Sequence, residues 1–150
     1  MVIWLLLTYA FLITQCSGQD MFPALKDGDL CVIFRQPTMN LLKEKYEAGD
    51  IVAYRVDGKR HFGRVVAIGG DSVQIDANGS VTVNGVAESW EILFPTYTRG
   101  DLMTYTLVND GTLYVLGDYR TNTEDSRDFG LIPLENVEGK VISILRRRGL

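Results

Sequence analysis

The chain has 150 residues, of which 46% are hydrophobic, and it carries a formal net charge of -4 at pH 7. This length and apolar content fit one compact domain with its own core and argue against two domains. The net negative charge provides no overall basic field for phosphates, which argues against nucleic acid as a partner. We interpret the basic run at 146–148 as a solvated tail.

The first thirteen residues, MVIWLLLTYAFLI, are uncharged and almost entirely apolar. As a helix they would span roughly 20 Å, which is short of the roughly 30 Å hydrocarbon core of a membrane. Three interpretations stay open: a truncated or mis-started membrane anchor, a cleaved signal peptide and a buried core helix. We favour the anchor, because the segment lacks the basic start and the small-residue cleavage site of a signal peptide. The expected division is a shortened membrane anchor at 1–15 and a β domain at 16–150.

Short apolar stretches separated by Gly, Asp and Asn turns fill most of the remaining chain, and this pattern predicts strands. The clearest hairpin is SVQIDANGSVTVNG, which alternates around Asn78-Gly79. The one helix expected beyond the N-terminus is MNLLKEKYEAGD at 39–50, ending at Gly49. The predicted strands, which give an all-β domain, cover 30–34, 50–56, 61–70, 72–76, 81–85, 104–108, 113–117 and 140–146.

The two cysteines and the single histidine restrict the chemistry of any site. Cys16 and Cys31 are too few for a disulfide framework, and neither has partners at metal-ligand spacing. Cys31, within LCVIF, has the character of a small buried hydrophobic residue. His61 alone excludes a multi-histidine metal site, so we predict no metal and no cofactor.

Three segments carry a more specific pattern: SGQDMFPALKDGD (17–29), FGRVVAIGGD (62–71) and GDYRTNTEDSRDFGLIP (117–133). In order and content they resemble type I signal peptidases, the membrane-anchored serine proteases that release exported proteins from their leader peptides. The third segment is the most specific, because GDYR and DSRDFG match the family at fixed spacing. The resemblance covers 17–145. It implies a coiled antiparallel β-sheet domain on the extracellular face of the cell membrane, held there by a single-pass N-terminal helix.

Both catalytic positions of that family can be located in this sequence, and both are exchanged. The family's nucleophilic serine precedes Met-x-Pro, where this chain has Asp20; the basic lysine precedes Arg-Val-Val, where it has Gly63. A serine needs an adjacent base, and glycine provides none. Asp20 is a weak nucleophile toward an amide and would place negative charge where an oxyanion forms. Two exchanges within one dyad indicate coordinated loss of catalysis.

Most other family positions are kept. The resemblance implies that the first segment retains the turn of the oxyanion hole and substrate groove, through Ser17, Gly18, Met21 and Pro23. In the third segment it implies groups that brace the active-site loops, although buried Asp–Arg pairs that merely hold the fold are the competing interpretation. These groups are Asp118, Arg120, Thr123, Asp125, Ser126 and Arg127.

A retained scaffold without its dyad suggests binding without cleavage. We expect an inactive signal-peptidase-like protein whose groove takes an extended exported polypeptide as an added strand. Such non-cleaving homologues resemble accessory proteins that help assemble sortase-linked pili in Gram-positive cocci. The expected role is therefore a pilus-assembly factor or chaperone, and the expected partner is a pilin or a pilus sortase. Alternatives are an active signal peptidase that uses His61 or Ser17, and an engineered double substitution of a normal peptidase.

Overall fold

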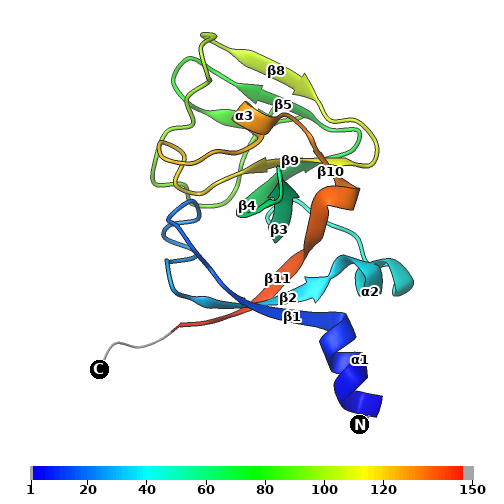
Figure 1. The fold of residues 1–150 in the computed structure, drawn as a ribbon. Coiled ribbons are helices and arrows are strands. Elements are labelled where there is room, and N and C mark those ends of the chain that lie inside the picture. Colours follow the sequence, from blue (N-terminus) through cyan, green and yellow to red (C-terminus); the bar gives the residue numbers. More distant parts are fainter. Residues whose placement is uncertain (1, 147–150) are drawn as a thin grey trace.

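The computed structural model describes residues 2–146 and contains two antiparallel sheets, one above the other in Figure 1. The smaller sheet has the order β7 (Val86–Ala87), β6 (Val81–Val83), β5 (Ser72–Ile75) and β8 (Thr104–Leu107). The larger sheet has the order β1 (Phe11–Gln15), β2 (Leu30–Arg35), β11 (Val137–Leu145), β3 (Ile51–Val56), β4 (Lys59–Ile68), β9 (Thr112–Leu116) and β10 (Ile132–Pro133). The mainly β fold expected from the sequence is confirmed.

All eight predicted strands are present, with ends shifted by a few residues. Three further strands were not predicted. Two of them, β7 and β10, have only two residues each, which is too short for an alternating pattern to be recognised. The third, β1, lies inside the apolar N-terminal run, where continuous hydrophobicity hides any period of two.

The helix predicted at 39–50 is wrong in position and length. The structure has α2 (Gln36–Leu41), with Pro37 in its first turn, where proline is tolerated. The helix ends because Lys43 takes a left-handed conformation, with φ of 59°. Its N–H donates to Asn40 O at 3.2 Å and the next N–H, of Glu44, donates to Met39 O at 2.9 Å. This is a Schellman termination, normally marked by glycine, so the sequence contained no clear stop at this point.

At the N-terminus, α1 (Val2–Ala10) leads directly into β1, and Figure 1 shows this helix extending away from both sheets. β1 pairs antiparallel with β2 from Phe11 opposite Phe34 to Gln15 opposite Leu30. Within residues 2–146, no helix combines the length and the apolar character needed to cross a membrane. The anchor assigned to 1–15 stays a prediction, and its last five residues belong to the larger sheet.

Three buried apolar clusters stabilise the domain. One is formed mainly by β3, β4 and β9, a second joins β4 and β9 to the smaller sheet, and the third supports the segment between β1 and β2. In the third cluster Cys31 is 0% exposed, which confirms its prediction as a small buried residue. Two short helical elements, α3 (Ser126–Phe129) and the 3₁₀ turn η1 (Leu134–Asn136), complete the described chain.

Candidate functional site

Asp20 lies in the loop between β1 and β2, and the loop is fixed by its own backbone contacts. Gly18 has φ of 92°, which favours glycine, and its N–H donates to Asp27 Oδ1 at 2.9 Å. Met21 and Leu25 are each 2% exposed and bury the underside of the loop. The loop therefore presents the nucleophile position on a defined backbone.

The Asp20 loop lies directly against the third sequence segment. The N–H of Tyr119 donates to the backbone oxygen of Asp20 at 2.9 Å. A Cβ added to Gly117 would lie 2.7 Å from that same oxygen and 2.5 Å from Thr123 Oγ1, distances that no real Cβ adopts. Glycine at 117 thus permits the first and third segments to approach each other. This close approach explains why the GDYR motif begins with glycine.

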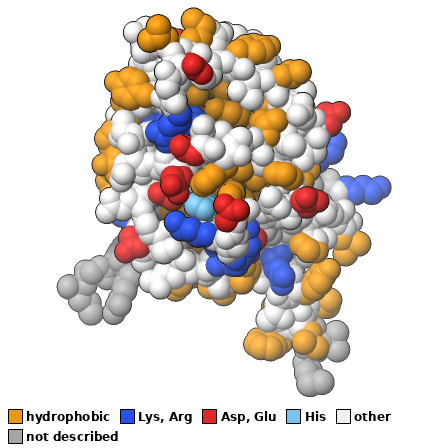
Figure 2. All heavy atoms as spheres, turned by 45° about the horizontal axis from the view of Figure 1, so that its top comes forward, with side chains coloured by type: hydrophobic (Ala, Val, Ile, Leu, Met, Phe, Trp, Pro, Cys, Tyr) orange, Lys and Arg blue, Asp and Glu red, His pale blue; other side chains and the backbone are white. Residues whose placement is uncertain are grey.

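Two adjoining hollows meet at Asp20, Lys59 and His61, which line both. One has a volume of about 220 Å³ and continues over the loop residues Ser17 and Gly18. The other is about 520 Å³ and more open, and its further lining residues are Arg99, Thr121, Asn122, Thr123, Glu124 and Asp128. Figure 2 shows acidic and basic side chains gathered around the histidine on this face. The hollows are large enough for side chains of a peptide.

Gly63, which the sequence resemblance predicts to stand at the family's lysine position, is buried in β4 opposite Val52 and does not line either hollow. A Cβ at Gly63 would lie 2.3 Å from Val115 Cγ1 and 3.3 Å from Tyr54 Cε1. Val115 and Tyr54 are both 0% exposed. These two side chains occupy the space that the first carbon of a lysine side chain would need.

Tyr54 is an unusual neighbour for this position. Its hydroxyl is buried and has no hydrogen-bond partner among the described residues. Burial raises the pKa of Tyr54 far above its ordinary value, so the phenol is neutral. The ring therefore fills space beside Gly63 and provides no base there.

His61, two residues before Gly63, is 4% exposed and enclosed by aromatic rings. Its ring stacks on Tyr54 at 5.6 Å between centroids and meets the edge of Phe129 at 5.0 Å. Burial lowers the pKa of His61, and the charge of Lys59 lowers it further. Burial likewise raises the pKa of Asp20, although His61 and Lys59 oppose this change. Both groups are thus shifted toward their neutral forms.

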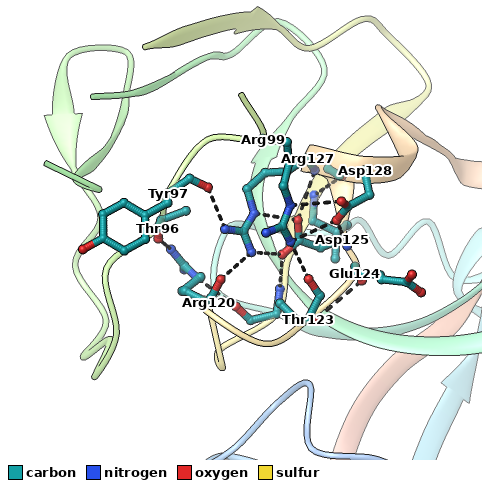
Figure 3. Close-up of polar contacts among 12 residues, drawn as sticks. Thr96, Tyr97, Arg99, Arg120, Thr123, Glu124, Asp125, Arg127 and Asp128 are labelled. Carbon is teal, nitrogen blue, oxygen red and sulfur yellow. Dashed lines mark hydrogen bonds and ion pairs between the residues drawn. The ribbon is translucent and has the colours of Figure 1, made fainter. Parts of the chain in front are cut away.

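The third segment contains a dense set of charged contacts, shown in part in Figure 3. Asp125 accepts from Arg127 Nε at 2.9 Å and from Arg127 Nη2 at 2.7 Å, and both side chains are at most 3% exposed. Asp125 also caps α3, in a capping box with Asp128. Ser126 Oγ accepts from Val115 N at 2.9 Å, so the cap is connected to β9.

Two further arginines extend this set to the rest of the domain. Arg120 is 0% exposed and donates to Gly117 O at 2.8 Å and to both carboxylate oxygens of Glu88 at 2.8 Å. Arg64, which follows Gly63, forms a bidentate pair with Asp118 at 2.8 and 2.6 Å. Through these pairs the segment is fixed to β4 and to the residue after β7.

Several of these residues were not singled out from the sequence. Lys59 and Tyr54 come to the site through strand register, since β3 and β4 place Tyr54 opposite His61. Glu88 lies in an irregular segment with no pattern to mark it as the partner of Arg120. Arg146 is exposed, as the interpretation of 146–148 as a solvated tail expects, although it also pairs with the buried Asp29 at 2.9 Å; residues 147–148 lie outside the described part.

The fold and the site together indicate the class of protein to which this chain belongs. A mainly β domain carries the Asp20 loop, the buried Gly63 on β4 and the Asp–Arg segment, the three parts whose sequence resembles type I signal peptidases. The family model described as "Signal peptidase, peptidase S26" matches residues 1–145. The chain belongs to this signal peptidase family.

Individual relatives agree with that assignment. Signal peptidase IB of Staphylococcus aureus is 29% identical over 153 residues, covering 87% of this chain and 76% of the relative. Signal peptidase I of Bacillus caldolyticus is 27% identical over 143 residues, covering 83% and 74%. The crystal structure of a signal peptidase I from Enterococcus faecalis matches with a TM-score of 0.55 and 26% identity, covering 67% of this chain and 98% of that one.

Proposed function

We propose that this chain is a catalytically inactive signal-peptidase-like protein that binds an exported polypeptide without cutting it. The observation that carries the proposal is the packing at Gly63. Val115 and Tyr54 take the space beside its Cα, so the position of the base has lost both the amine and the room for it. At the other position, Asp20 has a carboxyl group whose negative charge opposes formation of an oxyanion.

The hollow around Asp20 supports binding of an extended chain. Ser17 and Gly18 line its edge, and nothing lies within 4 Å of the position that a Gly18 Cβ would take. This space leaves room for a peptide beside the loop, and since the Gly18 N–H already donates to Asp27 Oδ1, pairing as an added strand would use other main-chain groups. Lys59, Glu124 and Arg99 at the rim offer both signs of charge to a polar peptide.

The family acts on exported polypeptides with leader peptides, and we propose an exported polypeptide as the ligand. The finer proposal is an accessory or chaperone role in pilus assembly, with a pilin or a pilus sortase as partner. For this role the domain would be tethered at the extracellular face of the cell membrane by the apolar N-terminal residues. The chain would then hold a partner at the surface where pilus subunits are joined.

A groove-blocking variant tests the binding proposal. Gly18 is unsuitable for it, because φ of 92° strains any side chain placed there. Ser17 is exposed at the edge of the hollow, and Ser17→Trp should reduce affinity for a pilin precursor at least tenfold. Ser80→Trp, at an exposed serine of the β5–β6 turn, is the matched control and should bind like the unaltered protein. Equal binding by all three proteins would contradict groove binding.

An active peptidase is the second candidate, and one observation favours it: Asp20, Lys59 and His61 share one hollow. In that case turnover of a leader peptide should be abolished by His61→Ala or by Ser17→Ala. The double change Asp20→Ser with Gly63→Lys addresses an engineered origin. Strong activity in that variant would indicate an intact peptidase site with two substituted residues. The packing at Gly63 predicts instead that the variant has no activity.

A further inference from the structure

The two cysteines lie beside each other beneath the Asp20 loop, and the proposed function does not use them. Their Sγ atoms are 3.3 Å apart, and the residues are 4% and 0% exposed. Cys31 pairs with Thr14 across β1 and β2, and Cys16 follows two residues after Thr14. Since side chains alternate along a strand, both thiols point to the same face of the sheet.

The backbone keeps this pair in register. Cys16 N–H donates to Asp29 O at 2.7 Å and Gly28 N–H donates to Cys16 O at 2.9 Å, so the ladder continues beyond the last residues of the strands. A disulfide bond has a length of about 2.05 Å, so the sulfurs need to move closer by about 1.3 Å. Cys16 can make this small movement, because it is the first residue of the loop after β1.

We propose that Cys16 and Cys31 form an intramolecular thiol-oxidation site, whose disulfide fastens the first residue of the Asp20 loop to β2. The bond would close the segment 16–31, which contains Ser17, Gly18 and Asp20. Oxidation would therefore restrict the loop that lines the hollow. This inference depends on the sulfur geometry alone and holds whether the hollow binds a peptide or cleaves one.

The reaction is thiol–disulfide exchange with a small-molecule disulfide as the oxidant. Cys16 lines the hollow and is the thiol that such an oxidant can reach. Its thiolate attacks one sulfur of the oxidant and releases one thiolate, leaving a mixed disulfide on Cys16. The Cys31 thiolate then attacks the Cys16 sulfur and releases the second. Overall, two protein thiols are oxidised, one oxidant disulfide is reduced to two thiols, and the two protons pass to those thiols.

In the reduced protein the two neighbouring thiols shift each other's pKa in opposite directions. The hydrogen bond with the Cys16 thiol lowers the pKa of Cys31, although burial acts against it. The same bond and burial raise the pKa of Cys16. The raised pKa of Cys16 should slow the first attack, whereas the 3.3 Å between the two sulfurs in the reduced protein favours closure by Cys31 once the mixed disulfide has formed.

Glutathione disulfide is the probe for the test, with the folded protein incubated below its unfolding temperature. Oxidation should remove both titratable thiols, as measured after denaturation, lower the mass of the monomer by about 2 Da, and raise Tm by about 5–10 °C. A reducing phosphine should reverse all three changes. The Cys31→Ala variant should keep one thiol and accumulate a glutathione adduct on Cys16.

Three results would overturn the proposal: two thiols remaining after prolonged oxidation, disulfide-linked dimers in place of an internal bond, or a disulfide that leaves Tm unchanged or lowers it. If Cys31→Ala fails to fold, mass and thiol titration of the unaltered protein still decide the matter. Oxidation in denaturant is the control for geometry. It should accumulate glutathione adducts and give a smaller share of the internal disulfide than the folded protein does.

Discussion

The region of Asp20 and Gly63 and the third segment of this domain differ in the contacts that their side chains make. Val115 and Tyr54 fill the space beside Gly63, and Asp20 lines an open hollow. In the segment 117–128, by contrast, the buried carboxylates of Asp118 and Asp125 accept hydrogen bonds at 2.6–3.2 Å from Arg64 of β4, from Arg127 of α3 and from the Gly117 N–H. The backbone around Asp20 is held in place by such contacts, including the hydrogen bond from the Tyr119 N–H to the Asp20 backbone oxygen.

This contrast separates two roles that an active peptidase combines. Charged pairs such as Arg120 with Glu88 position loops and contribute stability whether or not a reaction takes place. A nucleophile and its base contribute only to turnover, so their loss leaves the fold intact. A binding protein therefore retains the first set and can exchange the second. Four substitutions test this separation through the free energy of unfolding.

The largest effect is expected for Arg120→Met in the third segment. Arg120 is fully buried, and its loss leaves the Glu88 carboxylate, 12% exposed, without its partner. Removing one partner of a buried pair typically costs about 3–5 kcal/mol. Denaturant unfolding measures this value. Arg55→Met is the control, because Arg55 pairs with Glu138 while 47% exposed, and should cost at most about 1 kcal/mol. Equal losses in the two variants would contradict a stabilising role specific to the segment.

A smaller effect is expected at the other region, for Gly63→Ala. The new methyl group meets Val115 Cγ1, and overpacking of a buried site costs about 1–3 kcal/mol. In a Val115→Ala background the methyl group has room, so the same change should cost less by about 1 kcal/mol. A double-mutant cycle of denaturant unfolding measures this coupling. Additive effects would show that Val115 does not fill the position of the base.

The third prediction concerns the pH dependence of Asp20. Because its pKa is raised in the folded state, the folded protein binds more protons than the unfolded chain above the ordinary value of 3.8. Stability contributed by this group therefore falls as pH rises from 3.8 through the raised pKa. Asp20→Asn should be more stable than the unaltered protein at pH 7, by less than either preceding effect, and the difference should vanish below pH 3.8.

Thermal unfolding across pH 3–8 measures that difference. Asp57→Asn, at an exposed turn, is the control for removing one negative charge. A variant less stable than the unaltered protein at pH 7 would mean that the Asp20 carboxylate is stabilised by its neighbours and not strained by burial.

The smallest effect is expected where the end of β11 meets the Asp20 loop. Arg146 is 46% exposed, so its pair with Asp29 is partly screened by solvent. Arg146→Ala should lower the free energy of unfolding by less than Arg120→Met does, with no effect on the third segment. Amide hydrogen exchange should be faster in 24–29 and unchanged in 117–128. If Arg146→Ala lowered the free energy of unfolding as much as Arg120→Met, the third segment would not differ in stability from the Asp20 loop.

The sequence predicted the strands with long alternating or continuous apolar patterns, because those patterns reflect burial directly. It missed β1, whose apolar residues also fit a membrane helix, and it missed the end of α2 because Lys43 takes a conformation usually marked by glycine. For the site, the family resemblance predicts exchanged residues at Asp20 and Gly63, and this assignment stays a prediction. The packing of Tyr54 and Val115 beside Gly63 could not, because it depends on register between strands far apart in the chain.

The proposal of binding without cleavage is tested most directly by incubating the protein with an equimolar pilin precursor that carries its leader peptide. Mass spectrometry of the bound precursor is the measurement, and signal peptidase IB of Staphylococcus aureus is the cleaving control. The account predicts that the precursor is recovered intact from a complex that Ser17→Trp fails to form. Recovery of a product cut at one defined bond, with cleavage abolished by His61→Ala or Ser17→Ala, would contradict it.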